Sequence, residues 1–367
     1  MTAKNDSTGI LRRHRVKPKS TAPHTADNDN SFAKMRSTAT PTAGQLCFGF
    51  FALFCLLLIL RNSEIAIEYM TRGLLLCVRT VIPSLFPFAV LSELIVSGGI
   101  GTALIAKLAK PLCRLWGLSE AGCTAVLLGM LCGFPVGARC AVISYDAGQL
   151  SKREAEHVLA FSGNPSSAFL ISAVGVSLWG NRRFGMALYG TVLVVAVLTG
   201  ILLKYLRKPC KEDGSCTVPA AVPQAPVSGS RLFTDAIKSS TGSILLICAY
   251  VVFFSTLMGT LELVLAPLGL DAAVSAFLFC IFELSGGVSQ AATLGNSFLG
   301  ALLCAFGAGW SGLSVHCQAL SVTDGRGLSF KPYFAAKLLQ GILCAALFAL
   351  LITLFPTLTV PAEVCGR

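Results

Sequence analysis

The amino-acid sequence predicts an all-α polytopic membrane protein, built as an inverted repeat with two re-entrant helical hairpins and about seven full crossings. Three observations lead to this fold class. The mean hydropathy of the 367-residue chain is +0.72, and only 13% of its residues are charged. Apolar runs of about 20 residues, the length that crosses a bilayer as a helix, recur from residue 46 to residue 355. Two further runs, one in each half of the chain, are interrupted at their middle by helix-breaking or polar residues.

The elements follow one another along the chain as a tail, a first helix and two repeats. Residues 1–44 are polar and rich in Thr, Ser, Lys and Arg, which predicts a disordered basic cytoplasmic tail. Residues 45–61 form a short first transmembrane helix. Repeat one covers residues 62–203, and a Pro-, Ala- and Ser-rich cytoplasmic linker at 204–238 separates it from repeat two at 239–357.

The internal duplication rests on the order of unusual segments, because the identity between the halves is low. AVLLGMLCGFPVGARCA (125–141) corresponds to AFLFCIFELSGGVSQAA (276–292), and each is an apolar run broken at its middle. The next run in each half carries small polar residues, in AFSGNPSSAFLISA (160–173) and AFGAGWSGLSVHCQ (305–318). The limbs of each broken run are too short to cross a bilayer singly, so we expect them to form hairpins.

The distribution of positive charge tests this topology. If hairpins near 122–148 and 272–292 enter and leave the membrane on one side, the loops on the side of the N-terminus hold 22 Lys and Arg residues and the opposite segments hold 6. If both runs cross instead, the split is 16 against 12. Cytoplasmic loops carry the excess of positive charge in membrane proteins, so the counts favour hairpins and a cytoplasmic N-terminus. The halves then have opposite orientations, as in secondary transporters.

Charge and motifs narrow the class of function. The net charge of +11 comes from basic residues in the tail and loops, as in cytoplasmic membrane flanks, which predicts a lipid bilayer as partner and no nucleic acid. The sequence has no metal-binding spacing of His or Cys, no nucleophile elbow and no Walker-type loop. We therefore expect no enzyme, no metal and no cofactor, whereas a coupling proton or Na⁺ and a homo-oligomer are compatible with the chain.

The break in the first run, GFPVGAR, is a candidate binding element. Its glycines and proline release backbone N–H and C=O groups from helical bonding, which a membrane tolerates only against protein or a water-filled cavity. A half-helix N-terminus at this depth favours an anion, and a packing kink is the alternative. Arg139 would pair with a carboxylate or the solute, or extend to the interface. The candidate residues are Gly133, Phe134, Pro135, Gly137 and Arg139.

The break in the second run contains Glu283, an intramembrane carboxylate and therefore a functional hypothesis by default. Glu283 would couple a proton or Na⁺ to transport, or it would pair with Arg139. The candidate residues at this break are Glu283, Ser285, Gly286 and Gly287.

The run after each break supplies polar side chains to the same predicted site. Proline removes a backbone donor, so the Gly-Asn-Pro sequence at 163–165 unwinds a turn. The serines would contact a solute or bond neighbouring helices, and the one histidine would carry a proton or form a helix–helix hydrogen bond. The candidate residues are Ser162, Asn164, Ser166 and Ser167 in the first half and Ser311, Ser314, His316 and Gln318 in the second.

GFPVGAR, AFSGNPSSAF, FELSGG and GWSGLSVHCQ together resemble the YlbJ-type sporulation integral membrane proteins, within the wider nucleoside-recognition or gate family. The resemblance covers about residues 50–355, in order, and the long basic tail departs from it. It implies an architecture similar to that of concentrative nucleoside transporters, in which two hairpins surround the substrate. It also implies a role in endospore formation, with transport of dipicolinate, a small aromatic dianion, as the leading assignment.

We therefore expect a membrane transporter, secondary or facilitative, of a small polar or anionic solute such as dipicolinate. Its place would be the bacterial cytoplasmic membrane or the outer forespore membrane derived from the mother cell. A non-transporting sporulation scaffold is the alternative from another class, and a transporter of a nucleoside-like or other small solute is the alternative within the same class.

Overall fold

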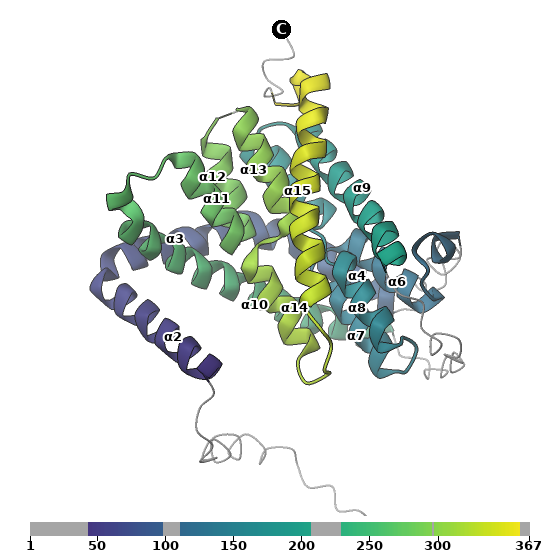
Figure 1. Cartoon of the computed structure of the whole chain (residues 1–367). Coiled ribbons are helices and arrows are strands. Elements are labelled where there is room, and N and C mark those ends of the chain that lie inside the picture. Colours follow the sequence, from purple (N-terminus) through teal and green to yellow (C-terminus); the bar gives the residue numbers. More distant parts are fainter. Residues whose placement is uncertain (1–42, 98–110, 207–228, 296, 360–367) are drawn as a thin grey trace, which may run out of the picture. The chain divides into compact units, whose positions relative to one another are not determined.

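The described part of the chain is helical throughout (Figure 1). The computed structural model describes residues 43–97, 111–206, 229–295 and 297–359. Nearly all of the predicted tail and the middle of the predicted linker lie outside these residues.

The chain divides into two compact units, residues 1–54 and 55–367. The described part of the first unit is the start of helix α2 (Ala43–Arg61), which includes residues 45–61. The remaining elements belong to the second unit. Those of its first half are α3 (Ser63–Leu76), the π-helical turn η1 (Cys77–Val81), α4 (Ile82–Ser97), α6 (Glu120–Cys132), α7 (Val136–Asp146), α8 (Lys152–Ser162), the π-helix η2 (Ala168–Leu178) and α9 (Arg182–Leu206).

The second half repeats the order of the later elements. In each half a hairpin-like pair of short helices follows the opening helices, a helix divided by a break comes next, and a long helix closes the half. The elements of the second half are α10 (Gly229–Leu265), η4 (Ala266–Leu268), α11 (Ala272–Phe282), α12 (Leu284–Thr293), α13 (Phe298–Trp310), α14 (Gly312–Thr323), α15 (Lys331–Leu354) and η5 (Pro356–Leu358).

Five helical segments in the described residues are long and apolar enough to cross a membrane. They are α2, α9, α10 with η4, α13 with α14, and α15, and a bent pair formed by Ser63–Val81 and Leu85–Leu91 would make a sixth. The sequence predicts about seven crossings. The missing one is the run at 158–179, which the structure divides into α8, a non-helical turn and η2. Gly163 and Pro165 in that turn cannot continue the helix, so neither part reaches the length of a span.

Both broken runs fold back on themselves, and glycines let their limbs approach closely. A Cβ atom added to Gly129 of α6 would lie 2.8 Å from the Cα of Gly137 in α7. A Cβ added to Gly287 of α12 would lie 2.5 Å from the Cα of Cys280 in α11. Backbones meet this closely only where one side has no side chain, so these glycines fix the two hairpin-like turns.

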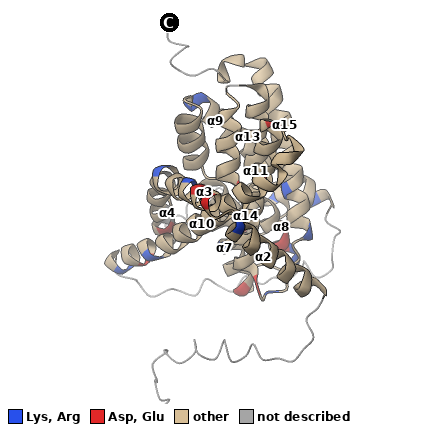
Figure 2. Ribbon diagram, turned by 90° about the vertical axis from the view of Figure 1, so that its left-hand side faces the viewer, with Lys and Arg blue, Asp and Glu red and all other residues tan. Residues whose placement is uncertain are grey.

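The two halves share one apolar core around α15. This helix packs against α13 of its own half and against α8 and α9 of the other half (Figure 1). Phe184 of α9 stacks on Trp179 at 4.1 Å between ring centroids and meets Phe348 of α15 edge to face at 5.2 Å. Most of the ribbon carries no charged residue (Figure 2), as expected of helices that face lipid or one another.

Candidate functional site

Each hairpin-like turn lies against the break in the helix that follows it. Gly133, at the turn between α6 and α7, has a φ of +80°, and a Cβ added there would lie 2.7 Å from the backbone nitrogen of Ser166. Gly312, at the break between α13 and α14, has a φ of +79°, and its added Cβ would lie 2.9 Å from the nitrogen of Leu284. Each half therefore has one close contact between turn and break, with the glycine on the turn in the first half and on the break in the second.

A cavity of about 50 Å³ lies between these two pairs of breaks. The first half contributes Phe134 and Ser166, and the second contributes Glu283, Ser285 and Gln318, with Ser314 beside them. The rest of the lining is apolar, from Val81, Leu85, Pro165, Phe169, Ile247, Val251, Leu284 and Val315. The volume suits a few water molecules or a small ion.

The other candidate residues do not line this cavity. Gly133, Pro135 and Gly137 form the first turn, and Gly286 and Gly287 belong to the start of α12. The remaining candidates outside the lining are Arg139, Ser162, Asn164, Ser167, Ser311 and His316.

Glu283 caps the helix that it precedes. Its side chain is 2% exposed, and its carboxylate accepts hydrogen bonds from the backbone N–H groups of Ser285 at 2.8 Å and Gly286 at 2.5 Å. Both donors lie in the first turn of α12, where the helix dipole also favours a negative charge. These contacts explain how a carboxylate can be buried at this depth.

The first half has no such cap. Pro135 precedes α7 and makes no side-chain hydrogen bond to its first turn, so the positive end of this helix dipole has no carboxylate of its own. The two turns therefore differ in charge. The turn before α7 suits an anion, and the turn before α12 carries one.

Arg139 contacts hydroxyl groups, and Glu283 contacts backbone N–H groups, so the two do not bond to each other. Arg139 is half-buried, and its Nη1 donates to Ser239 Oγ at 3.3 Å and Ser243 Oγ at 3.2 Å. Both serines lie on α10. Arg139 therefore ties the first turn to the first helix of the second half.

The polar residues of the break after α8 bond mostly to their own backbone. Asn164 Nδ2 donates to the carbonyl of Phe161 at 2.8 Å, and Ser166 Oγ accepts from the N–H of Phe169 at 3.2 Å. Ser162 Oγ is buried without a partner, and Ser167 is half-buried. Asn164 thus holds the end of α8, and Ser166 holds the start of η2.

The second half contains more unpartnered polar atoms. Ser311 has a left-handed φ of +79°, which is rare for a residue other than glycine. Its Oγ and that of Ser314 are buried without a hydrogen-bond partner. His316 Nδ1 lies 2.9 Å from the hydroxyl of Tyr333, whereas its Nε2 has no partner. Native proteins rarely leave buried polar atoms without a partner, so these atoms are candidate contacts for water or a solute polar group.

Lys337 is absent from the candidate residues predicted from the sequence. It lies within α15, and its side chain is 0% exposed. Its Nζ donates to the carbonyl of Gly163 and lies 5.7 Å from the ring centroid of Phe134. A signal was available, because Lys337 and Gln340 are three residues apart within an apolar run and so share one helix face.

A larger cavity, of about 470 Å³, borders the second turn from another side. Gly286 lines it, together with Arg72 and Arg79 from the α3–η1 segment and Ser289 and Gln290 from α12. The turn at Glu283–Gly286 therefore has the small cavity on one side and a larger, basic one on the other.

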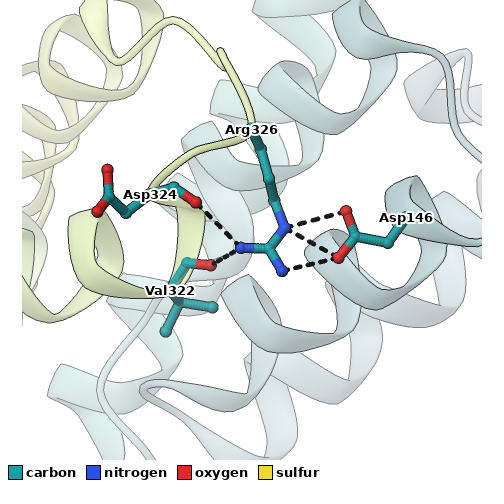
Figure 3. Close-up of polar contacts among 4 residues, drawn as sticks. All are labelled: Asp146, Val322, Asp324 and Arg326. Atoms are coloured by element: carbon teal, nitrogen blue, oxygen red, sulfur yellow. Dashed lines mark hydrogen bonds and ion pairs between the residues drawn. The ribbon is translucent and has the colours of Figure 1, made fainter. Parts of the chain in front are cut away.

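An ion pair joins the two halves at the end of α7 (Figure 3). Arg326 Nη2 lies 2.8 Å from Asp146 Oδ2, and its Nη1 donates to the carbonyls of Val322 and Asp324. Arg326 holds the pKa of the Asp146 carboxyl below its usual range. The contact joins the end of α7 to the loop after α14.

The chain is similar to the sporulation integral membrane protein YlbJ of Bacillus subtilis (strain 168). The identity is 26% over 335 residues, which cover 82% of this chain and 81% of that protein. No protein-family model matches the chain, and no solved structure is similar to it. The similarity supports the predicted resemblance to YlbJ-type proteins and, with the apolar helices, supports an integral membrane protein.

Proposed function

We propose that this protein is a membrane transporter, secondary or facilitative, of a small organic anion, and that the anion is dipicolinate moved during endospore formation. The observation that carries the proposal is the cavity at which broken helices from both halves present buried polar groups. A scaffold built of unbroken helices would have no need to interrupt four of them at one point. The similarity to a sporulation protein supplies the physiological setting.

The difference in charge between the two turns suggests that one turn binds the solute and the other binds the coupling ion. The turn before α7 leaves its positive helix end free for an anion. The turn before α12 carries the Glu283 carboxylate, which faces the small cavity and suits a proton or Na⁺. Solute and coupling ion would then bind on opposite walls of one cavity, as in transporters with broken helices.

The cavity would have to widen in each transport cycle. Its 50 Å³ lies far below the roughly 300–1,000 Å³ typical of small-molecule sites. The larger cavity beyond Gly286 has about 470 Å³, so movement of the α11–α12 pair would join the two spaces. We propose that α6–α7 and α11–α12 are re-entrant hairpins of an inverted repeat and that they open in turn to opposite sides of the membrane.

Flux into liposomes tests the proposal. Purified protein should equilibrate or accumulate labelled dipicolinate, with uridine as a neutral nucleoside for comparison and protein-free liposomes as the control. Flux of dipicolinate above the control supports the proposal. Flux of uridine without flux of dipicolinate would mean that the protein is a transporter of a different solute. Absence of flux for both solutes would overturn the proposal.

A sporulation scaffold is the second candidate, and the small volume of the cavity favours it. In a scaffold the buried serines would bond only water or neighbouring helices. Such a protein would show no flux with any solute. It would instead lose co-purifying envelope proteins when residues 1–42 or 207–228 are deleted.

A further inference from the structure

Lys337 is a cation buried inside a membrane-spanning helix with little to neutralise it. None of its side chain is exposed, and the acceptor of its Nζ is the neutral carbonyl of Gly163. Lys337 takes part in none of the ion pairs among the described residues. No Asp or Glu oxygen of those residues lies within 4.0 Å of its Nζ. Burying an ammonium group inside a membrane protein costs several kcal/mol unless an anion pairs with it. We therefore expect a negatively charged partner for Lys337.

Two neighbours of Lys337 also have unmet hydrogen-bonding capacity. Gln340 follows one turn later on the same face of α15, is 2% exposed, and neither its Nε2 nor its Oε1 has a partner. His316, whose Nε2 is also unpartnered, bonds to Tyr333 one turn before Lys337. Native proteins rarely leave such atoms unsatisfied, so a polar occupant would complete this region.

The ring of Phe134 connects Lys337 to the small cavity. Phe134 lines that cavity, and the same ring lies 5.7 Å from Lys337 Nζ. Its edge also approaches Gly163, whose added Cβ would lie 3.5 Å from Cε1 of the ring. Phe134 therefore lies both at the cavity and beside the ammonium.

We propose that Lys337 binds a carboxylate of the transported solute, exchanging its bond to the Gly163 carbonyl for one to the solute, after Phe134 has swung aside. The inference rests on the proposed transport function and narrows its substrate to carboxylates. In the absence of solute, the Gly163 carbonyl holds the ammonium at the break between α8 and η2. A purely structural role, in which Lys337 only ties α15 to that break, is the competing explanation.

The test compares three pyridines of similar shape and different charge in the liposome assay. They are dipicolinate, the monocarboxylate picolinate, and the neutral pyridine-2,6-dicarboxamide. Lys337→Met removes the charge with little change of length, Lys337→Arg keeps it, and Lys331→Met is the matched control on an exposed lysine of the same helix. We expect Lys337→Met to raise the KM for dipicolinate about tenfold or more, the effect of losing a charged hydrogen bond. Lys337→Arg should recover part of the loss, and Lys331→Met should behave as wild type.

A binding measurement separates recognition from stability. Dipicolinate should raise the Tm of the detergent-solubilised wild type and of Lys331→Met, and should not raise that of Lys337→Met. A wild-type KM and an unchanged Tm shift in Lys337→Met would overturn the inference. If Lys337→Met does not accumulate, transport by the wild type provides the test. Equal transport of the neutral dicarboxamide and of dipicolinate by the wild type would also overturn the inference. Absence of wild-type flux for all three pyridines would instead overturn the proposed function itself.

Discussion

Buried polar residues at the hairpin-like turns and at the breaks that follow them are of two kinds, which differ in whether their side chains have a hydrogen-bond partner. Glu283 and Asn164 bond to backbone groups of their own segment, so each has a structural role that would exist without any solute. Ser311 and Ser314 have hydroxyl oxygens with no partner, so they are free to bond water or a solute. We expect substitution of a residue of the first kind to change the shape of the site. Substitution of a residue of the second kind should change which water or solute groups bind there.

Glu283→Gln should separate capping from charge. The amide oxygen can still accept a bond from the first turn of α12, so we expect a loss of only about 0.5–2 kcal/mol in stability. Flux of the solute should fall several-fold and lose its response to an imposed proton or Na⁺ gradient, because the neutral side chain cannot bind either ion. Glu64→Gln, at an exposed position of α3, is the control. A gradient response equal to that of the wild type would contradict the coupling role.

Asn164→Ala should weaken the break after α8. It removes the bond from Nδ2 to the Phe161 carbonyl, which is worth about 1 kcal/mol, and leaves the end of the helix less well defined. We expect several-fold lower flux with the protein still present in the membrane, measured as flux per reconstituted molecule. Flux per molecule equal to that of the wild type would show that the geometry of this break does not matter for transport.

At the scale of elements, the turns depend on glycines for shape and on contacts between breaks for position. Gly133 has φ +80° and ψ −164°, a conformation that is essentially restricted to glycine. Its surroundings add a second constraint, since Ser166 occupies the place of a Cβ. The first turn and the break after α8 therefore form one packed unit.

Gly133→Ala should prevent that unit from forming. The combination of backbone strain, about 1–3 kcal/mol, and overlap with Ser166 predicts a large fall in Tm in detergent and in abundance in the membrane. Gly190→Ala is the matched control, because nothing lies within 4 Å of a Cβ at that position in α9, and alanine is a better helix former there. A Tm for Gly133→Ala as high as that of the wild type would contradict the described turn.

At the scale of the whole molecule, polar contacts outside the apolar core also tie one half to the other. Arg139 bonds to α10, Lys337 of α15 bonds to Gly163, and Asp146 pairs with Arg326 (Figure 3). The first two are buried or half-buried. The ion pair of Asp146 and Arg326 is exposed to water, so salt and pH should control it.

The Asp146–Arg326 link should weaken in acid. The pKa of Asp146 is lowered from 3.8 in the folded protein, first by its hydrogen bond with Arg326. A lowered pKa stabilises the folded state above the usual pKa of the carboxyl, and that contribution disappears as the pH falls through the lowered value. We expect a small Tm difference between wild type and Asp146→Asn at pH 7 that vanishes in strong acid and shrinks in high salt. A difference that is independent of both pH and salt would show that packing is responsible.

The sequence predicted the helices, the two broken runs and the breaks after them, because glycine, proline and isolated polar residues in an apolar run act locally on the backbone. It could not predict the partners of the charged residues. Arg139 and Glu283 have opposite charges and similar settings in the sequence, yet one bonds to serines of α10 and the other caps α12. Those choices depend on which helix faces which, and that is a property of the packed molecule.

The sequence by itself determined that this is a helical membrane protein and where its helices are interrupted, since hydropathy and backbone chemistry are local properties. The tertiary structure alone decided that Lys337 is buried beside the break at Gly163. It also decided that residues of both halves line the small cavity at the breaks. Both facts arise from contacts between segments more than 100 residues apart, such as the 174 residues between Gly163 and Lys337, which no local pattern records.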